Sequence, residues 1–214
     1  MAKINPLERI NFDLNLNASS IFGIDEVGWG CIAGGLVLGG CLIKSSSYEE
    51  MIKTSSPLLS IIRDSKKVTE LNRNKIVGEL SSLPVEVFTG HASVEEINKV
   101  GLAEAYNLAL SRLLSQLKDS KALIILDGSR VPSLLKNYNC QLIIKGDDKS
   151  LAIGIASIVA KECRDSLMKK AHEVYPQYGF DSNKGYGTAD HITALKTHGL
   201  TPIHRLKGTT TILS

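Results

Sequence analysis

Short apolar runs and amphipathic segments alternate along most of the chain. Five runs are rich in β-branched and other apolar residues and are bounded by turn-forming residues, a pattern that predicts β-strands. These runs cover residues 21–24, 34–43, 85–89, 122–126 and 141–144. The run at 122–126 is apolar throughout, as expected of a buried strand.

Capping residues and helical spacing predict helices between these strands. Thr69 is a suitable N-cap, and Ser93 with Glu96 has the pattern of a capping box. The predicted helices lie at 48–63 (weakly), 70–82, 93–101, 102–117, from about 150 through 165, and 188–198. The spacing at 102–117 is that of a long amphipathic helix packed in the core. Strands and helices that alternate in this way predict an α/β domain.

Composition and charge fit one soluble domain. The chain has 214 residues, of which 43% are hydrophobic and 22% charged. The net charge of +3 does not by itself indicate a polyanionic partner. The four cysteines have no zinc-ligand spacing, so we expect free or buried thiols in a reducing cytoplasm. The N-terminus has no signal-peptide pattern, and the apolar runs are too short and glycine-interrupted to span a membrane.

Acidic residues follow three of the predicted strands. Asp25 and Glu26 follow the first strand, Asp127 ends the run at 122–126, and Asp147 lies just beyond the last strand. Ligand-binding groups collect at strand ends in sheets of this kind, so these four carboxylates can converge. One such aspartate alone is usually a turn residue, and that interpretation stays open for each of them.

Carboxylates packed together need a compensating cation, because otherwise some of them stay protonated. Oxygen ligands suit Mg²⁺ or Mn²⁺, and two such ions, about 3.5–4 Å apart, can promote phosphodiester hydrolysis. A dinucleotide site is the rival interpretation of Gly28-Trp29-Gly30. It fails because acids precede the first glycine and the next segment is strand-like.

Several motifs, taken together and in order, resemble ribonuclease HII, which cuts the RNA strand of RNA–DNA hybrids and the junction at single ribonucleotides in DNA. The resemblance extends from about residue 21 to 205. Its motifs are Gly23-Ile24-Asp25-Glu26-Val27-Gly28, Asp64-Ser65-Lys66-Lys67, Leu126-Asp127-Gly128, Lys145-Gly146-Asp147, Ala156-Ser157-Ile158-Val159-Ala160-Lys161 through Arg164-Asp165, Tyr175-Pro176-Gln177-Tyr178-Gly179-Phe180, Lys184-Gly185-Tyr186-Gly187-Thr188 and Thr201-Pro202-Ile203-His204-Arg205. It implies an RNase H-like fold, a mixed five-stranded sheet flanked by helices.

The resemblance also implies a site. Metal and catalytic roles fall on Asp25, Glu26, Asp127 and Asp147, with Asp148 as the neighbouring alternative to Asp147. In the family a glycine-arginine-glycine segment senses the 2′-hydroxyl through its backbone, and a tyrosine stacks at the junction sugar. The corresponding substrate-binding candidates here are Gly28, Trp29, Gly30, Tyr186, and, as phosphate contacts, Ser65, Lys66, Lys67, Lys161 and Lys184. Each lysine can equally be a solvated surface residue.

The chain departs from the family around Gly28-Trp29-Gly30, which we call the glycine turn. Trp29 replaces the family's arginine, and Cys31 and Gly35 replace prolines. A positive charge near the substrate is thereby lost, and we expect weaker or altered junction cleavage, with Trp29 stacking on a sugar or base. The alternative is that Trp29 packs locally. We expect none of the five histidines, including His204, to have a chemical role.

The resulting prediction is a metal-dependent endonuclease that acts on RNA within duplex nucleic acid and works as a monomer in the cytoplasm. We expect an N-terminal arm or unimportant short helix over residues 1–20, a catalytic domain over 21–206 and a short tail over 207–214. The alternatives are another nuclease of the same superfamily and an inactive hybrid-binding protein.

Overall fold

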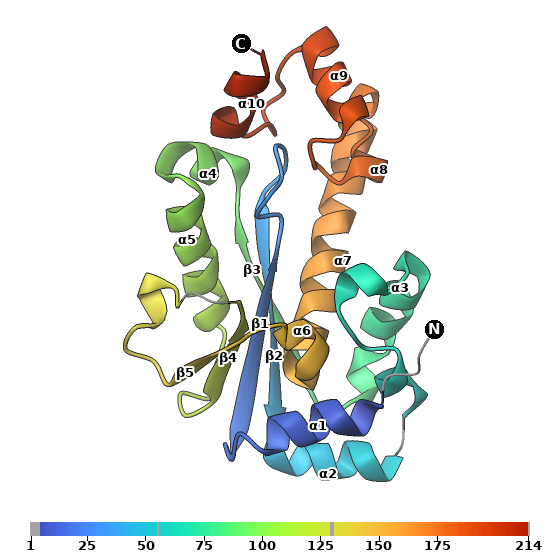
Figure 1. Cartoon of the computed structure of the whole chain (residues 1–214), viewed down its shortest axis with the longest axis vertical. Coiled ribbons are helices and arrows are strands. Elements are labelled where there is room, and N and C mark those ends of the chain that lie inside the picture. Colours follow the sequence, from blue (N-terminus) through green and yellow to red (C-terminus); the bar gives the residue numbers. More distant parts are fainter. Residues whose placement is uncertain (1–4, 55, 129–130, 214) are drawn as a thin grey trace.

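A five-stranded mixed sheet forms the centre of the computed structural model, which describes residues 5–54, 56–128 and 131–213. The strand order is β3-β2-β1-β4-β5. The strands are β1 (Ser20–Val27), β2 (Leu36–Lys44), β3 (Glu86–Ala92), β4 (Leu123–Asp127) and β5 (Cys140–Ile143). The first three pair antiparallel, whereas β4 runs parallel to both β1 and β5. The predicted fold class is confirmed (Figure 1).

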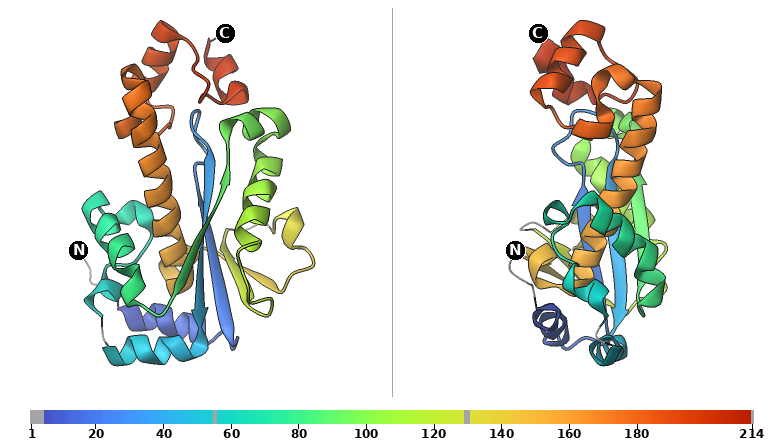
Figure 2. Two further views of the ribbon diagram at one scale, coloured as in Figure 1. Left: turned by 180° about the vertical axis from the view of Figure 1, so that it is seen from behind. Right: turned by 90° about the vertical axis from the view of Figure 1, so that its right-hand side faces the viewer.

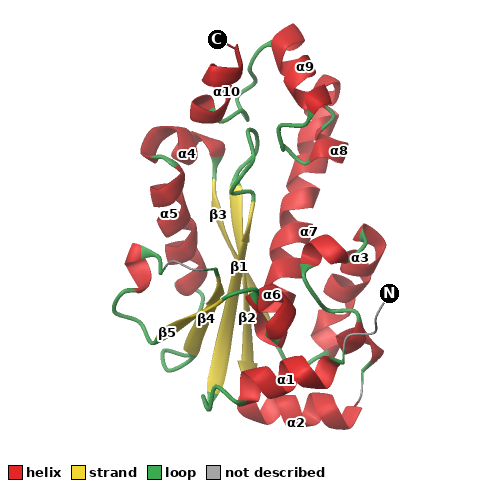
Figure 3. Cartoon of the chain, viewed as in Figure 1, coloured by secondary structure: helices red, strands yellow, loops and turns green. Residues whose placement is uncertain are grey.

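Helices cover both faces of this sheet (Figures 1 and 2). One face packs against α5 (Leu102–Leu114), in a core that includes Phe22 and Leu38. The other face packs against α7 (Leu151–Val174), in a core that includes Ile21 and Ile43. The remaining helices are α1 (Pro6–Leu14), α2 (Ser45–Thr54), α3 (Glu70–Glu79), α4 (Val94–Val100), α6 (Gly146–Lys149), α8 (Phe180–Asn183), α9 (Ala189–His198) and α10 (Leu206–Leu213). Figure 3 shows how the helices enclose the strands.

Two strand glycines let α7 approach the sheet closely. A Cβ atom at Gly39 would lie 2.1 Å from the Ala156 carbonyl oxygen, and one at Gly23 would lie 2.5 Å from the Ala152 carbonyl carbon. Any larger residue would push the helix away from the strands. This close contact places the α7 side chains beside the acidic end of β1.

The short helix expected near the N-terminus is present as α1, but it is part of the core, so the expectation that it has little importance is wrong. Arg9, Ile10 and Asp13 of α1 are buried. The Asp13 carboxylate accepts hydrogen bonds from the backbone amides of Leu151 (3.0 Å) and Ala152 (3.1 Å) at the start of α7. It therefore satisfies donors that a helix N-terminus would otherwise leave unpaired. Residues 1–4 lie outside the described residues.

The first strand extends further than predicted, and its last residues pair with a neighbouring strand on one side only. The strand predicted to end at Ile24 continues to Val27, because Asp25 and Glu26 still pair with Gly39 and Leu38 on β2. The short helices α6, α8 and α10 were not predicted. No helix among the described residues is both long and apolar enough to cross a membrane.

Candidate active site

The acidic site begins where β1 and β4 separate. Their parallel pairing ends at Ile24 and Leu126, so Asp25 and Asp127 follow at the same level on adjacent strands. Ile24 and Leu126 both face the α5 side of the sheet. Because side chains alternate along a strand, Asp25 and Asp127 both face the α7 side. Residues that are 102 positions apart in the sequence therefore meet at one point of the fold.

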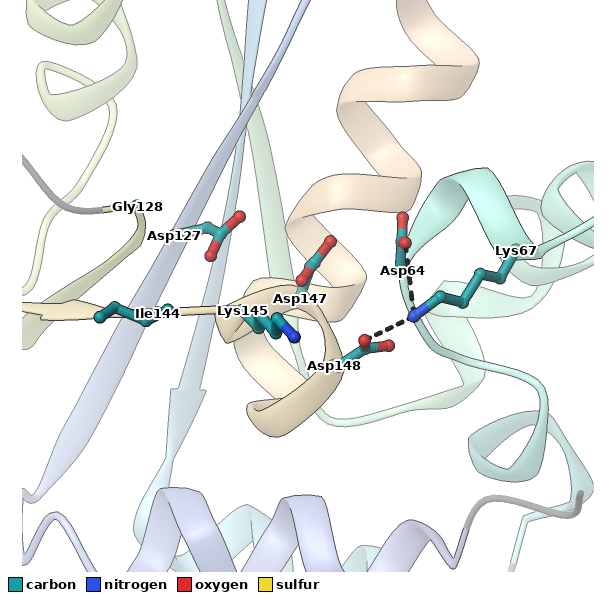
Figure 4. Close-up of a pocket in the computed structure, with 8 residues that line it drawn as sticks. All are labelled: Asp64, Lys67, Asp127, Gly128, Ile144, Lys145, Asp147 and Asp148. Atoms are coloured by element: carbon teal, nitrogen blue, oxygen red, sulfur yellow. Dashed lines mark hydrogen bonds and ion pairs between the residues drawn. The ribbon is translucent and has the colours of Figure 1, made fainter.

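The turn after β5 brings Asp147 next to Asp127. Lys145 adopts a left-handed conformation (φ 56°) and directs the chain into α6. The Gly146 amide then donates a 2.7 Å hydrogen bond to the Asp127 carboxylate. Figure 4 shows Asp64, Asp127 and Asp147 around one hollow, which we call the acidic cavity. Its lining is Asp64, Lys67, Asp127, Gly128, Ile144, Lys145, Asp147 and Asp148.

Asp148 is held away from its neighbour by an ion pair. Lys67 Nζ lies 2.5 Å from Asp148 Oδ2 and 3.7 Å from Asp64 Oδ2. This contact connects α6 with the 3-10 turn at Ser65–Lys67 (Figure 4). Asp147 has no such basic partner among the salt bridges of the described residues. In this geometry Asp148 is paired with a lysine, whereas Asp147 remains open to the acidic cavity.

A second cavity lies beside Asp25 and Glu26, and we call it the turn cavity. Its lining joins the acidic pair to the glycine turn and to most of the predicted substrate-binding residues. The lining residues are Asp25, Glu26, Val27, Gly28, Trp29, Gly30, Ser65, Lys66, Lys161 and Tyr186. Four separate segments of the chain thus supply one concave surface.

The carboxylates influence one another's protonation. Burial raises the pKa of Asp25 to about 6, and the charges of Asp127 and Asp147 add to this effect while hydrogen bonds from Ser157 and the Glu26 amide oppose it. Burial also raises the pKa of Glu26 to about 8, with further contributions from Asp25 and Asp127. Burial and then Asp127 raise the pKa of Asp147. All four acids therefore belong to one electrostatic cluster.

This donor set fits a hard divalent cation. Every candidate ligand is a carboxylate oxygen, and burial together with the neighbouring carboxylates raises the pKa of Asp25, Glu26 and Asp147. Mg²⁺ and Mn²⁺ prefer such oxygen ligands. Within the described part of the chain, no three His, Cys, Asp or Glu side chains already have the arrangement of a metal site. The acids line two open cavities and would have to draw together around a cation.

Two buried arginines hold the glycine turn and the chain that follows it. Arg164 donates to the carbonyl oxygens of Gly35 (3.0 Å), Ala33 (3.0 Å) and Lys184 (2.7 Å). Arg205 donates to those of Gly34 (2.8 Å), Gly35 (3.0 Å) and Trp29 (3.3 Å). A fork of several donors fixes the direction of each carbonyl that it contacts. These arginines hold the turn without contacting the cavity.

Gly28 is required by this packing. Its φ of 105° is a conformation that other residues rarely adopt, and a Cβ atom there would lie 2.4 Å from Arg164 Nε. Gly30 has open space around it instead. The main chain at Gly28 is therefore fixed, while that at Gly30 is accessible to a ligand.

Trp29 lies at the mouth of the turn cavity with its side chain 49% exposed. Its ring contacts Tyr106 of α5 edge-on, with the ring centroids 5.7 Å apart. Burial raises the pKa of Tyr106, and the charges of Glu26 and Asp25 add to this effect. One side of the Trp29 ring is therefore packed locally and the remainder faces solvent.

The predicted phosphate-binding lysines divide into two groups. Lys66 and Lys161 line the turn cavity, and Asp165 holds Lys161 through a 2.7 Å ion pair. Lys67 lines the acidic cavity instead, in the ion pair described above. Lys184 lines neither of these two cavities; its buried amine donates to the Asp181 carbonyl.

Three buried polar residues near the site had not been expected from the sequence. Arg9 donates to the carbonyl oxygens of Ser150 (3.0 Å) and Asp147, and so anchors α6 from behind. His191 and His204 form a buried contact beneath the turn at residues 184–186, which we call the Tyr186 turn. No local pattern marks such residues, because their partners are distant in the sequence.

Comparison with known proteins gives a consistent result. A family model described as Ribonuclease HII matches residues 22–211. Ribonuclease HII of Chlamydia caviae is 39% identical over 188 residues, which cover 87% of this chain and 82% of that protein. Ribonuclease HII of Anaplasma phagocytophilum is 40% identical over 186 residues, covering 86% and 83%.

Solved structures show the same fold. The ribonuclease H2 of Pyrococcus horikoshii superposes with a TM-score of 0.71 at 24% identity, covering 91% of this chain and 97% of that one. A Bst-RNase HIII structure in complex with Mn²⁺ gives a TM-score of 0.63 at 16% identity, covering 85% and 64%. At these identities the structural likeness supports the fold.

Proposed function

The chain belongs to the ribonuclease HII family and is a type 2 ribonuclease H, and we propose that it cuts both the RNA strand of RNA–DNA hybrids and duplex DNA on the 5′ side of embedded ribonucleotides. The observation that carries the proposal is the meeting of the acidic cluster with the glycine turn. Asp25 and Glu26 line the same cavity as Gly28, Gly30 and Tyr186. A reacting phosphate and the ribose beside it would thus be bound together.

We assign the metal-binding role to Asp25, Glu26, Asp127 and Asp147. Two bound Mg²⁺ or Mn²⁺ ions would supply an activated water and stabilise the leaving 3′-oxygen, which gives 5′-phosphate and 3′-hydroxyl ends. Their positive charge would also keep the four acids ionised, despite the burial that raises the pKa of Glu26 to about 8. Asp127 is oriented for this role by the Gly146 amide.

Substrate selection would fall on the turn cavity. The backbone at Gly28–Gly30 is held by Arg205, which donates to the Trp29 carbonyl, and packs closely on Arg164 at Gly28. It would hydrogen bond the 2′-hydroxyl, which only RNA offers. Tyr186 would stack on the sugar at the junction. Phosphate contacts would come from Ser65, Lys66 and Lys161, which line this cavity, and from Lys67 in the acidic cavity. The buried Lys184 donates to the Asp181 carbonyl, so we assign it no phosphate contact. Trp29 would stack on a sugar or base with its exposed side.

The proposal is tested by offering the protein three matched duplexes: a continuous RNA–DNA hybrid, DNA with one ribonucleotide, and all-DNA of the same sequence. We expect cleavage of the first two in Mg²⁺ or Mn²⁺, none in chelator, and none of the third. Equal cutting of all-DNA would indicate a general nuclease. Tight binding of the hybrid without cleavage would indicate a hybrid-binding protein. We further propose that the chain acts as a monomer in the cytoplasm.

A further inference from the structure

Two buried histidines lie directly beneath the Tyr186 turn. His191 of α9 is 0% exposed and His204 is 1% exposed. Their Nε2 atoms are 3.1 Å apart, and the rings of Tyr178 and Phe180 pack around them. Two imidazoles can share such a contact only when one nitrogen donates a hydrogen and the other accepts it.

The surrounding hydrogen bonds fix which nitrogen carries each proton. The Thr201 amide donates to His204 Nδ1 at 2.9 Å, so the proton of His204 is on Nε2 and points at His191. His191 Nε2 accepts it, and His191 Nδ1–H then donates to the Tyr186 carbonyl at 2.8 Å. Burial lowers the pKa of both rings, which keeps them neutral.

This chain of hydrogen bonds, which we call the relay, ends at the Tyr186 turn. The Tyr186 turn is itself hydrogen bonded to the chain that follows the glycine turn. The Gly185 carbonyl accepts hydrogen bonds from the amides of Ile32 (2.9 Å) and Ala33 (3.1 Å). Gly185 has a φ of 83°, and a Cβ atom there would lie 2.3 Å from the Ala33 carbonyl oxygen. A displaced Tyr186 turn would therefore also move the chain that follows Gly30.

The segment that carries His204 contacts the glycine turn as well. The Arg205 amide donates to the Ile32 carbonyl at 2.8 Å, and the Arg205 side chain donates to the Trp29 carbonyl at 3.3 Å. Residues 201–205 therefore bind the Tyr186 turn through His191 and the glycine turn directly. Both turns line the turn cavity.

We propose that His204 and His191 are positioning residues for ribose recognition. The relay runs from Thr201 through both rings to the Tyr186 carbonyl and fixes the position of the Tyr186 ring relative to the glycine turn. The inference rests on the proposed function, because it concerns the same cavity. Neither histidine lines the turn cavity or the acidic cavity. Misplacement by about 1 Å of a group that orients a substrate can cost about 100-fold in rate, so a buried support can matter as much as a contact.

The test uses two substitutions of His191 that differ in one hydrogen bond. His191→Asn keeps an N–H near the position of Nδ1, and therefore keeps a donor for the Tyr186 carbonyl that does not need His204 to fix its tautomer. In both variants the His204 Nε2–H loses its partner, so only the hydrogen bond to Tyr186 differs between them. His191→Leu keeps an apolar volume and has no donor. Thermal unfolding of each variant reports its fold, and kcat and KM are measured on the single-ribonucleotide duplex and on the continuous hybrid.

We expect His191→Leu to lose about tenfold or more in kcat/KM on the single-ribonucleotide duplex and less on the hybrid, where many riboses are available, while His191→Asn stays within about threefold of the parent. Equal activity of a folded His191→Leu variant, or equal losses for both variants on both substrates, would overturn the proposal. A parent chain that cuts neither duplex would instead refute the proposed function.

A spectroscopic measurement tests the relay without any substitution. Nitrogen-15 spectra of the imidazoles at neutral pH should show His204 protonated on Nε2 and His191 on Nδ1. The opposite tautomers, or a charged ring at neutral pH, would overturn the relay even if every variant proved inactive or unfolded.

Discussion

Lys67 Nζ lies 2.5 Å from Asp148 Oδ2, whereas the adjacent Asp147 faces the acidic cavity beside Asp127. Two neighbouring aspartates therefore have different roles. One is neutralised by a lysine from the 3-10 turn, and the other remains available to a cation. Under the proposed function, this difference assigns Asp147 rather than Asp148 to the metal site.

Replacing each aspartate in turn gives a matched comparison. We predict that Asp147→Asn abolishes metal-dependent cleavage and that Asp148→Asn keeps activity within about threefold of the parent, because the ion pair of Asp148 is largely exposed and worth little. Initial rates in saturating Mg²⁺ decide the question. Equal losses for the two variants would place both carboxylates on the metals.

Restoring a positive charge at the glycine turn should change the salt dependence of binding. Trp29→Arg returns the family's arginine at a side chain that is 49% exposed, so the fold should be unaffected. One added phosphate contact should steepen the slope of log affinity against log salt by about 0.9. Filter binding of a single-ribonucleotide duplex in chelator measures this slope. Identical slopes and cleavage rates for both proteins at all salt concentrations would contradict a substrate-facing Trp29.

The raised pKa values predict how the stability of the metal-free protein depends on pH. Because the pKa of Asp25 is raised to about 6 and that of Glu26 to about 8, the folded state binds more protons than the unfolded state between about pH 4 and 8. This contribution to stability is complete below the unfolded pKa values and is lost as pH rises through the folded ones. Denaturant titrations in chelator should therefore show a falling contribution from Glu26.

The control for this prediction is Glu26→Gln, which removes the titrating group with the highest of these pKa values. The difference in unfolding free energy between parent and variant should change across pH 6 to 8 in chelator. Added Mg²⁺ should stabilise the parent more at pH 8 than at pH 6, since bound cations favour the ionised acids. A difference that is independent of pH would show that Glu26 does not titrate in this range.

The first helix should influence metal binding from a distance. Arg9→Lys keeps the charge, but one amine cannot replace two guanidinium nitrogens, of which Nη1 donates to the Ile62 carbonyl and Nη2 to the Ser150 and Asp147 carbonyls. Helix α6 should therefore loosen, and the affinity for Mn²⁺ should fall. Asp13→Ala is the control on the same helix. It leaves the α7 amides unpaired and should cost about 1–3 kcal/mol of stability with little effect on Mn²⁺ affinity. Calorimetric titration with Mn²⁺ separates the two, and equal Mn²⁺ affinities for Arg9→Lys and the parent would contradict the prediction.

Local patterns in the sequence were sufficient to predict the strands and the acidic residues at their ends. Each strand that carries an acid has an apolar run, and the parallel pairing of β1 with β4 then brings Asp25 level with Asp127. The end of β1 was missed because Asp25 and Glu26 look like turn residues and are paired on one side only. Helix α6, with four residues, is too short to leave a periodic signal.

The supports of the site could not be predicted in this way. Arg9, Arg164 and Arg205 donate to carbonyl oxygens that are far away in the sequence, and a buried arginine looks the same in the sequence as an exposed one. The two histidines acquire direction only from their partners in the fold. The sequence therefore indicates the reactive groups, whereas the structure shows what holds them in place.

The central claim is that Asp25, Glu26, Asp127 and Asp147 together bind the divalent cations that cut RNA. Its most direct test is cleavage of a duplex with one embedded ribonucleotide by the parent and by Asp127→Asn, mapped to the nucleotide in Mg²⁺ and in Mn²⁺. We predict a cut on the 5′ side of the ribonucleotide by the parent, leaving a 3′-hydroxyl, and no cut by a folded Asp127→Asn variant. Undiminished cleavage by that variant would contradict the account.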